Sequence, residues 1–113
     1  MSVEIKDRIV HMLEAIQKIE EFTSDRSFED FEENPQIQYA CLYSFSIIGE
    51  AVVFLPGNIK DKYPYPYYLV RSMRNYANHT YHKIDFKIIW NTITMDLPKF
   101  KHLLELILKN EFN

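Results

Sequence analysis

Apolar side chains recur with a helical period through the long segments of this chain, and this periodicity most strongly constrains its fold. In residues 3–22 an apolar residue recurs every three or four positions, and charged residues occupy the other face. Residues 35–55 and the segment after Asp85 follow the same pattern. The stripe in residues 3–22 consists of Ile5, Ile9, Met12, Leu13, Ile16 and Ile19. The sequence therefore predicts amphipathic helices.

Glycine is scarce, which argues against a fold built from β-sheet. Only two of the 113 residues are glycine, Gly49 and Gly57, whereas the tight turns of β-hairpins usually need it. Apolar residues make up 47% of the chain, which is enough for one packed core. We therefore expect a single all-α domain over residues 1–113, an antiparallel up-and-down bundle of four long helices and a short extra helix.

Capping residues predict where several helices begin. Ser27 and Asp30 have the spacing of a capping box at the start of a short helix. Asn34 followed by Pro35 predicts the start of a long helix, with asparagine as the cap and proline in the first turn. Asp85 is the candidate cap of the last helix.

Prolines predict one loop and one break. Pro64 and Pro66 lie within residues 58–66, and a residue before proline is disfavoured in the α region, so this segment is expected to be a loop. The next helix is expected from about residue 66 to about residue 78. Pro98 falls within the last helical pattern and is expected to kink that helix or divide it.

Cysteine content and the N-terminal segment exclude several classes of protein. Cys41 is the single cysteine, which rules out an internal disulfide and a paired-cysteine zinc site. Its apolar neighbours favour a buried thiol. Residues 1–14 mix charges into their apolar residues, unlike a signal peptide, and no apolar run reaches the roughly 18 residues of a membrane span. We expect a cytoplasmic protein without a membrane partner.

Charge is distributed unevenly along the chain. The net charge is −3, but residues 1–33 carry −6 and residues 34–113 carry +3. No carboxylate lies between Asp61 and Asp85. The basic and histidine residues of that stretch are Lys62, Arg71, Arg74, His79, His82 and Lys83. An acidic protein can therefore present one basic region that binds a phosphate.

Arg74 and His79 are the candidate catalytic residues. An arginine on the last turns of a helix and a histidine at its end can converge on one small anion. Arginine presents fixed, charged donors to a phosphate, and histidine can transfer a proton near neutral pH. The pair suits metal-independent cleavage of RNA, in which the 2′-hydroxyl attacks the adjacent phosphate. The spacing alone leaves a structural role open, because both residue types are favoured near a helix C-terminus.

The segment from Arg74 to Tyr81 resembles the arginine-x4-histidine-x-tyrosine motif of HepT-like toxins, which belong to the HEPN superfamily. Further short matches in the same order extend the resemblance from about residue 5 to about residue 108. They are Ile47 to Ala51, Lys62 to Pro64, Met73 to Asn75, Asp85, Ile89 with Trp90, and Asp96 to Pro98.

The resemblance implies a helical bundle that forms a homodimer and brings two copies of the motif to a shared cleft. It implies a ribonuclease toxin neutralised by a minimal nucleotidyltransferase antitoxin, in some pairs through transfer of adenylate from ATP to the motif tyrosine, here Tyr81. Arg74 and His79 would be catalytic, and Asn75 is the polar residue that follows the arginine. The resemblance implies no metal or cofactor, and the dimer could belong to a larger toxin–antitoxin complex.

Glu50 and Arg71 are candidates for supporting the motif. Glu50 could be partly buried and pair with Arg74 or Arg71, or it could belong to a solvated face. Five tyrosines near the basic region could stack on bases, but packing of the loop onto the bundle or a dimer contact is the favoured interpretation. They are Tyr63, Tyr65, Tyr67, Tyr68 and Tyr76.

Two other classes of function stay open at this point. One is a non-catalytic HEPN subunit that binds nucleotide, RNA or a nucleotidyltransferase partner without cleaving RNA. The other is a nucleotide-binding structural dimer. The intact pair of Arg74 and His79 favours the ribonuclease hypothesis over both.

Overall fold

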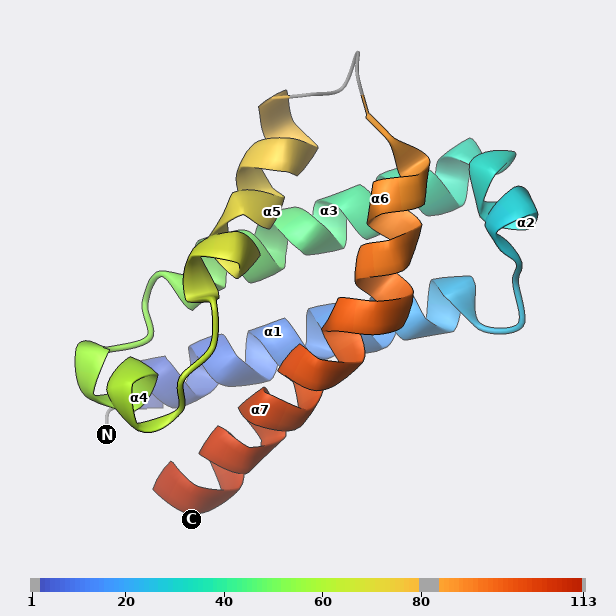
Figure 1. Ribbon diagram of the computed structural model, residues 1–113. Coiled ribbons are helices and arrows are strands. Elements are labelled where there is room, and N and C mark those ends of the chain that lie inside the picture. Colours follow the sequence, from blue (N-terminus) through green and yellow to red (C-terminus); the bar gives the residue numbers. More distant parts are fainter. Residues whose placement is uncertain (1–2, 80–83, 113) are drawn as a thin grey trace.

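The computed structural model describes residues 3–79 and 84–112, and every regular element in these residues is helical (Figure 1). The long α-helices are α1 (Val3–Thr23), α3 (Pro35–Val52), α5 (Tyr67–His79) and α7 (Leu97–Glu111). The short ones are α2 (Phe28–Glu32), α4 (Gly57–Lys62) and α6 (Phe86–Asn91), and a π-helical segment, Thr92–Asp96, joins α6 to α7. The all-α helical bundle predicted from the sequence is confirmed.

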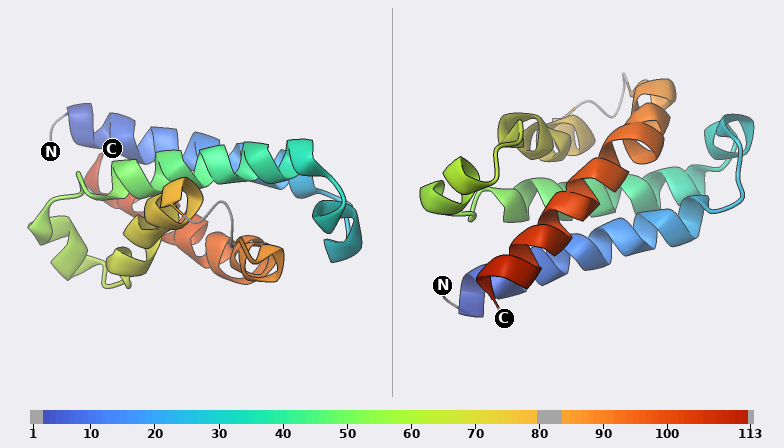
Figure 2. Two further views of the ribbon diagram at one scale, coloured as in Figure 1. Left: turned by 90° about the horizontal axis from the view of Figure 1, so that it is seen from above. Right: turned by 60° about the horizontal axis from the view of Figure 1, so that its bottom comes forward.

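Helix α3 lies at the centre of the bundle. It packs against α1 on one side and α5 on another, and these two contacts are the most extensive between helices. Helices α1 and α3 run antiparallel, and α6 and α7 form a bent rod whose α7 part crosses α1 obliquely (Figures 1 and 2). The N-terminal part of α1 therefore lies beside the C-terminal part of α3.

The apolar stripe predicted for α1 forms one wall of the core. Ile9, Met12, Ile16 and Ile19 are completely buried, and Leu104 and Ile107 of α7 are buried as well. Burial of each such side chain contributes about 1.5–3 kcal/mol, so these contacts hold α7 on α1. Cys41 of α3 is buried as predicted, and desolvation by burial raises the pKa of its thiol to about 12.

The predicted helix starts are confirmed by hydrogen bonds. The Ser27 hydroxyl accepts from the Asp30 backbone N–H at 3.1 Å, and the Asp30 carboxylate accepts from the Ser27 N–H at 3.2 Å, which completes the capping box. Asn34 Oδ1 accepts from the backbone N–H of Ile37, and Asp85 Oδ1 from that of Lys87. Local chemistry was sufficient to place these three starts.

The segment expected to be a loop contains a helix, which corrects the prediction for residues 58–66. Helix α4 begins after Pro56 and ends at Lys62. The conformational restraint of a proline acts on the residue that precedes it, here Tyr63 and Tyr65, and both lie outside the helix. Residues 57–62 are therefore free to form a helix.

The C-terminal end of α7 holds the connection between α4 and α5 in place. Lys62 Nζ lies 2.8 Å from Glu111 Oε2, and the Tyr63 hydroxyl donates to the same oxygen at 2.7 Å. The hydrogen bond from Lys62 contributes most to lowering the pKa of Glu111. Tyr67, the first residue of α5, donates its hydroxyl to the Tyr63 carbonyl oxygen at 2.5 Å. This network fixes the start of α5.

The tyrosines of this connection mostly pack, as favoured from the sequence. Tyr63 and Tyr67 are buried, and the half-buried Tyr65 ring lies 5.3 Å from the Phe100 ring centroid. Tyr68 is exposed, and the side chain of Tyr76 lies outside the described part of the chain. Trp90, expected in the core, is half-buried and lies 5.3 Å from the Phe31 ring centroid.

The last helical segment is divided, as Pro98 predicts. The π-helical residues 92–96 directly precede α7, in which Pro98 is the second residue, and the Leu97 N–H donates to the Thr92 carbonyl five residues back. Proline has no N–H to continue the α-helical pattern, so the register changes just before it. The segment therefore bends, and its α7 part crosses α1 obliquely.

Candidate active site at the contact between α3 and α5

Gly49 brings the backbones of α3 and α5 into direct contact. A Cβ placed on Gly49 would lie 2.6 Å from both the Cβ and the backbone nitrogen of Arg74, and 3.1 Å from the Arg71 carbonyl oxygen. Any side chain here would push α5 away, so only glycine permits this packing. The contact fixes the base of the Arg74 side chain against α3.

The Arg74 guanidinium is held by Glu50, the residue after Gly49. Arg74 Nε donates to Glu50 Oε1 at 3.0 Å, and the two side chains are 44% and 59% exposed. The sequence left open a partly buried Glu50 paired with an arginine and a Glu50 on a solvated face; the structure has the pairing with Arg74, on an exposed side chain. An exposed ion pair contributes at most about 1 kcal/mol to stability. The ion pair therefore contributes little to stability, and its effect is to hold the Arg74 guanidinium in one orientation.

Four of the predicted site residues line one cavity of about 440 Å³ between α1, α3 and α5. They are Glu50, Arg71, Arg74 and Asn75. Gly49, Val53, Phe54 and Arg8 complete the lining. Three arginines and one carboxylate leave a surplus of positive charge, and the terminal nitrogens of arginine are the donors that bind phosphate in pairs. The arrangement suits a bound phosphate.

Arg8 is the site residue that the sequence did not predict. It belongs to the acidic first third of the chain, and its spacing within α1 marks only an exposed face. The antiparallel packing of α1 on α3 brings it to the cavity. Arg8 is one of four basic residues in the acidic residues 1–33, and nothing distinguishes it from the others until the helices are assembled.

His79 is the last residue of α5, five residues after Arg74, which corresponds to a rise of about 7.5 Å along the helix. The side chain of His79 and the whole of Tyr81 lie outside the described part of the chain. The structure therefore locates the arginine half of the motif, and the position of the other half stays a prediction.

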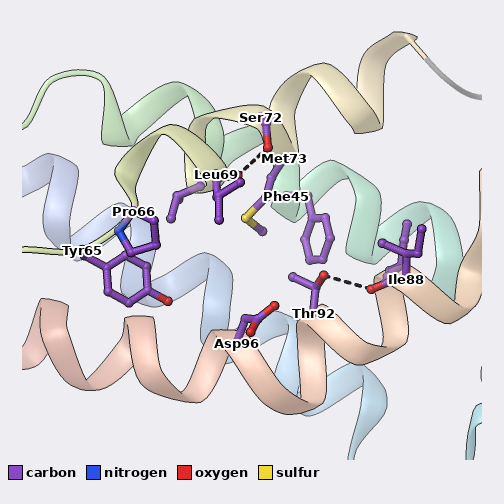
Figure 3. A pocket seen from close by; sticks show the side chains of 11 residues that line it. Phe45, Tyr65, Pro66, Leu69, Ser72, Met73, Ile88, Thr92 and Asp96 are labelled. Carbon is purple, nitrogen blue, oxygen red and sulfur yellow. Dashed lines mark hydrogen bonds between the residues drawn. The ribbon is translucent and has the colours of Figure 1, made fainter.

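A second cavity, of about 300 Å³, lies between α5 and the α6–π-helical segment (Figure 3). Phe45, Met73, Leu69 and Ile88 point into it, and Asp96 is the charged residue of its lining. An apolar cavity with a carboxylate and no basic side chain repels a phosphate. Of these two cavities, the arginine cavity is the one whose lining suits an anion.

Metal-ligating residues do not gather in the described structure. Across residues 3–79 and 84–112, no three histidine, cysteine, aspartate or glutamate side chains lie close enough to hold a metal ion. In the same residues, no helix combines the length and the apolar character needed to cross a bilayer.

The structure is a small all-α bundle with an arginine-lined cavity beside its central pair of helices. The model of the HepT-like ribonuclease family matches residues 12–107 of this chain, and the chain belongs to that family.

Several curated relatives are similar to this chain along nearly its whole length. The probable ribonuclease HepT of Thermococcus cleftensis is 35% identical over 105 residues, covering 92% of this chain and 96% of its own. A protein of Methanocaldococcus jannaschii whose name describes it as an RNase is 33% identical over 108 residues, covering 95% and 93% of the two chains. A protein of Caldanaerobacter subterraneus, also named as an RNase, is 33% identical over 102 residues, covering 89% and 91%. No solved structure matches the chain significantly.

Proposed function

We propose that this chain is the toxin of a HepT-type toxin–antitoxin pair and that it cleaves RNA without a metal ion through Arg74 and His79. The observation that carries the proposal is the Arg74 guanidinium, fixed by Glu50 in a cavity with two further arginines. Membership of a ribonuclease family supports RNA as the substrate.

The proposed reaction uses the 2′-hydroxyl of the RNA as the nucleophile. The hydroxyl attacks the adjacent phosphorus, the bond from phosphorus to the 5′-oxygen breaks, and a 2′,3′-cyclic phosphate is formed. His79 takes the proton of the hydroxyl or delivers one to the leaving oxygen. Arg74 stabilises the negative charge that develops on the phosphoryl oxygens, and Asn75 can donate a further hydrogen bond. Glu50 keeps the arginine in position.

A homodimer is part of the same proposal. Tyr39 and Tyr43 lie one turn apart on α3 and are 72% and 71% exposed. Exposed aromatic side chains on one helix face are typical of a protein interface. A dimer would bring two arginine cavities to one RNA-binding cleft.

The test is cleavage of a ribo-oligonucleotide by the chain purified without an antitoxin, in excess EDTA. The proposal predicts fragments that end in a 2′,3′-cyclic phosphate, and no cleavage where the 2′-hydroxyl at the cut position is replaced by hydrogen. A protein that binds RNA or its antitoxin and leaves RNA intact would instead be a non-catalytic binding subunit. Cleavage that requires a divalent metal would contradict the proposed mechanism.

We propose that a nucleotidyltransferase antitoxin neutralises the toxin by transferring adenylate to Tyr81. Tyr81 is the second residue after His79 in the sequence, so an added phosphate would introduce negative charge next to the catalytic residues and repel RNA.

Tyr81→Phe is therefore expected to retain RNA cleavage and to escape neutralisation. Intact mass after incubation with the antitoxin and ATP should show one or more added adenylates on the wild-type chain and none on the variant. Tyr68→Phe, at an exposed tyrosine of α5, is the matched control and should be modified like the wild type. Adenylate on the Tyr81→Phe chain would exclude Tyr81 as the target.

A further inference from the structure

We propose that Arg8 and Arg71 form a second phosphate-binding subsite beside Arg74, which holds the RNA backbone next to the phosphate that is cleaved. The inference rests on the proposed function, because it takes RNA as the ligand. Its ligand is a neighbouring phosphodiester of the same RNA strand. Both residues line the cavity that contains Arg74, and they come from different helices, α1 and α5.

Arg8 is held in position by an aromatic ring. Its guanidinium carbon lies 3.8 Å from the centroid of the Phe54 ring, and the side chain is half-buried. When a guanidinium stacks on an aromatic ring, its flat face contacts the ring. Its N–H donors point outward in its own plane, where they can bind a phosphate. Among the described residues no carboxylate pairs with Arg8. This arginine is therefore ordered without an anion of its own.

Arg71 precedes Arg74 by one turn of α5, and residues three apart lie on the same helix face. Its side chain is exposed, and within residues 3–79 and 84–112 it forms no ion pair with a carboxylate. Its carbonyl oxygen lies 3.1 Å from the place that a Cβ on Gly49 would take, so this turn of α5 packs closely on α3. The two arginines thus flank Arg74 with two unneutralised charges.

The charge balance of the cavity favours a polyanion over a single phosphate. Glu50 is engaged by Arg74 Nε and offsets one of the three positive charges. The lining therefore carries a net charge of +2, and one positive charge remains after a single phosphodiester has bound. Consecutive phosphates of an RNA strand supply one negative charge each, so a strand that enters the cavity can engage Arg8 and Arg71 while Arg74 engages the reacting phosphate.

The test measures RNA binding in a His79→Ala background, in which RNA stays intact. Binding of a fluorescent single-stranded RNA is followed across salt concentrations for the parent, Arg8→Gln, Arg71→Gln and the double variant. Each lost phosphate contact should weaken binding about tenfold at low salt and reduce the slope of log affinity against log salt by about 0.7. In the double variant the slope should be reduced by about twice that amount.

Two controls separate charge at this site from other effects. Arg26→Gln removes one arginine beyond the far end of α1, more than about 20 Å from Arg8, and should keep the parental slope. Arg8→Lys keeps the charge but not the planar stacking, so it should keep the slope and bind somewhat more weakly. Melting temperatures verify that each variant is folded.

Each outcome has a defined meaning. Equal slopes for Arg8→Gln, Arg71→Gln and Arg26→Gln would overturn the subsite while cleavage by the wild type still supported the proposed function. The predicted slopes with a wild type that leaves RNA intact would support the subsite and overturn the ribonuclease proposal. Binding of AMP as tight as that of RNA, with the same loss in Arg8→Gln, would assign the cavity to a free nucleotide and overturn the inference.

Discussion

Replacing Arg74 by alanine is expected to lower the rate of RNA cleavage by roughly 10²–10³-fold, the usual loss for one preorganised donor to a developing oxyanion. Stability should change little, because the ion pair with Glu50 is exposed and contributes at most about 1 kcal/mol. Arg74→Lys should also be strongly impaired, since the three donors of an ammonium lie on one nitrogen and cannot bind Glu50 and two phosphate oxygens in the planar geometry of a guanidinium. Single-turnover rates and melting temperatures measure both effects.

Glu50→Gln is the matched control for the Arg74 variants. It keeps the shape of the partner and removes its charge, so the amide oxygen can still accept from Arg74 Nε but the restraint on the guanidinium is weaker. We expect a smaller fall in rate than for Arg74→Ala, with unchanged folding. Cleavage by Arg74→Ala at the wild-type rate would exclude Arg74 from catalysis.

Gly49→Ala is expected to lower both the stability and the activity, although it touches no substrate. The new Cβ would lie 2.6 Å from both the backbone nitrogen and the Cβ of Arg74, and neither atom can move without moving α5. Overpacking of this kind costs about 1–3 kcal/mol, and the better helix propensity of alanine offsets about 1 kcal/mol of it. We expect a melting temperature lower by several degrees.

The same substitution should reduce the cleavage rate by about 10–100-fold, because α5 must move and carries Arg74 with it, and displacement of a catalytic group by about 1 Å can cost 10²-fold. Gly57→Ala is the control, since a Cβ there meets nothing within 4 Å. It should leave the melting temperature and the rate close to those of the wild type. Equal behaviour of the two alanine variants would contradict the close contact of α3 with α5.

The fold was predictable from the sequence where local chemistry decides it. The caps at Ser27, Asn34 and Asp85 depend on hydrogen bonds between residues a few positions apart. The division before Pro98 depends on the N–H that proline lacks. Helix α4 was missed because the proline restraint was extended to residues it does not affect. Its last residue, Lys62, is bound by Glu111, 49 positions further along the chain.

The site was predictable only in part. Arg71, Arg74 and Asn75 are near one another in the sequence, and Glu50 came from the expected pairing with an arginine. Arg8 depends on how α1 packs against α3, which no local pattern encodes. The significance of Gly49 also appears only when α5 lies against it.

The most direct test of the account is the rate of RNA cleavage by the unmodified wild-type chain and by His79→Ala, measured side by side in EDTA. A general acid–base residue contributes about 10²–10⁴-fold, so the account predicts cleavage by the wild type and a loss of that size in the variant. Equal rates for the two proteins, or intact RNA with the wild type, would contradict it.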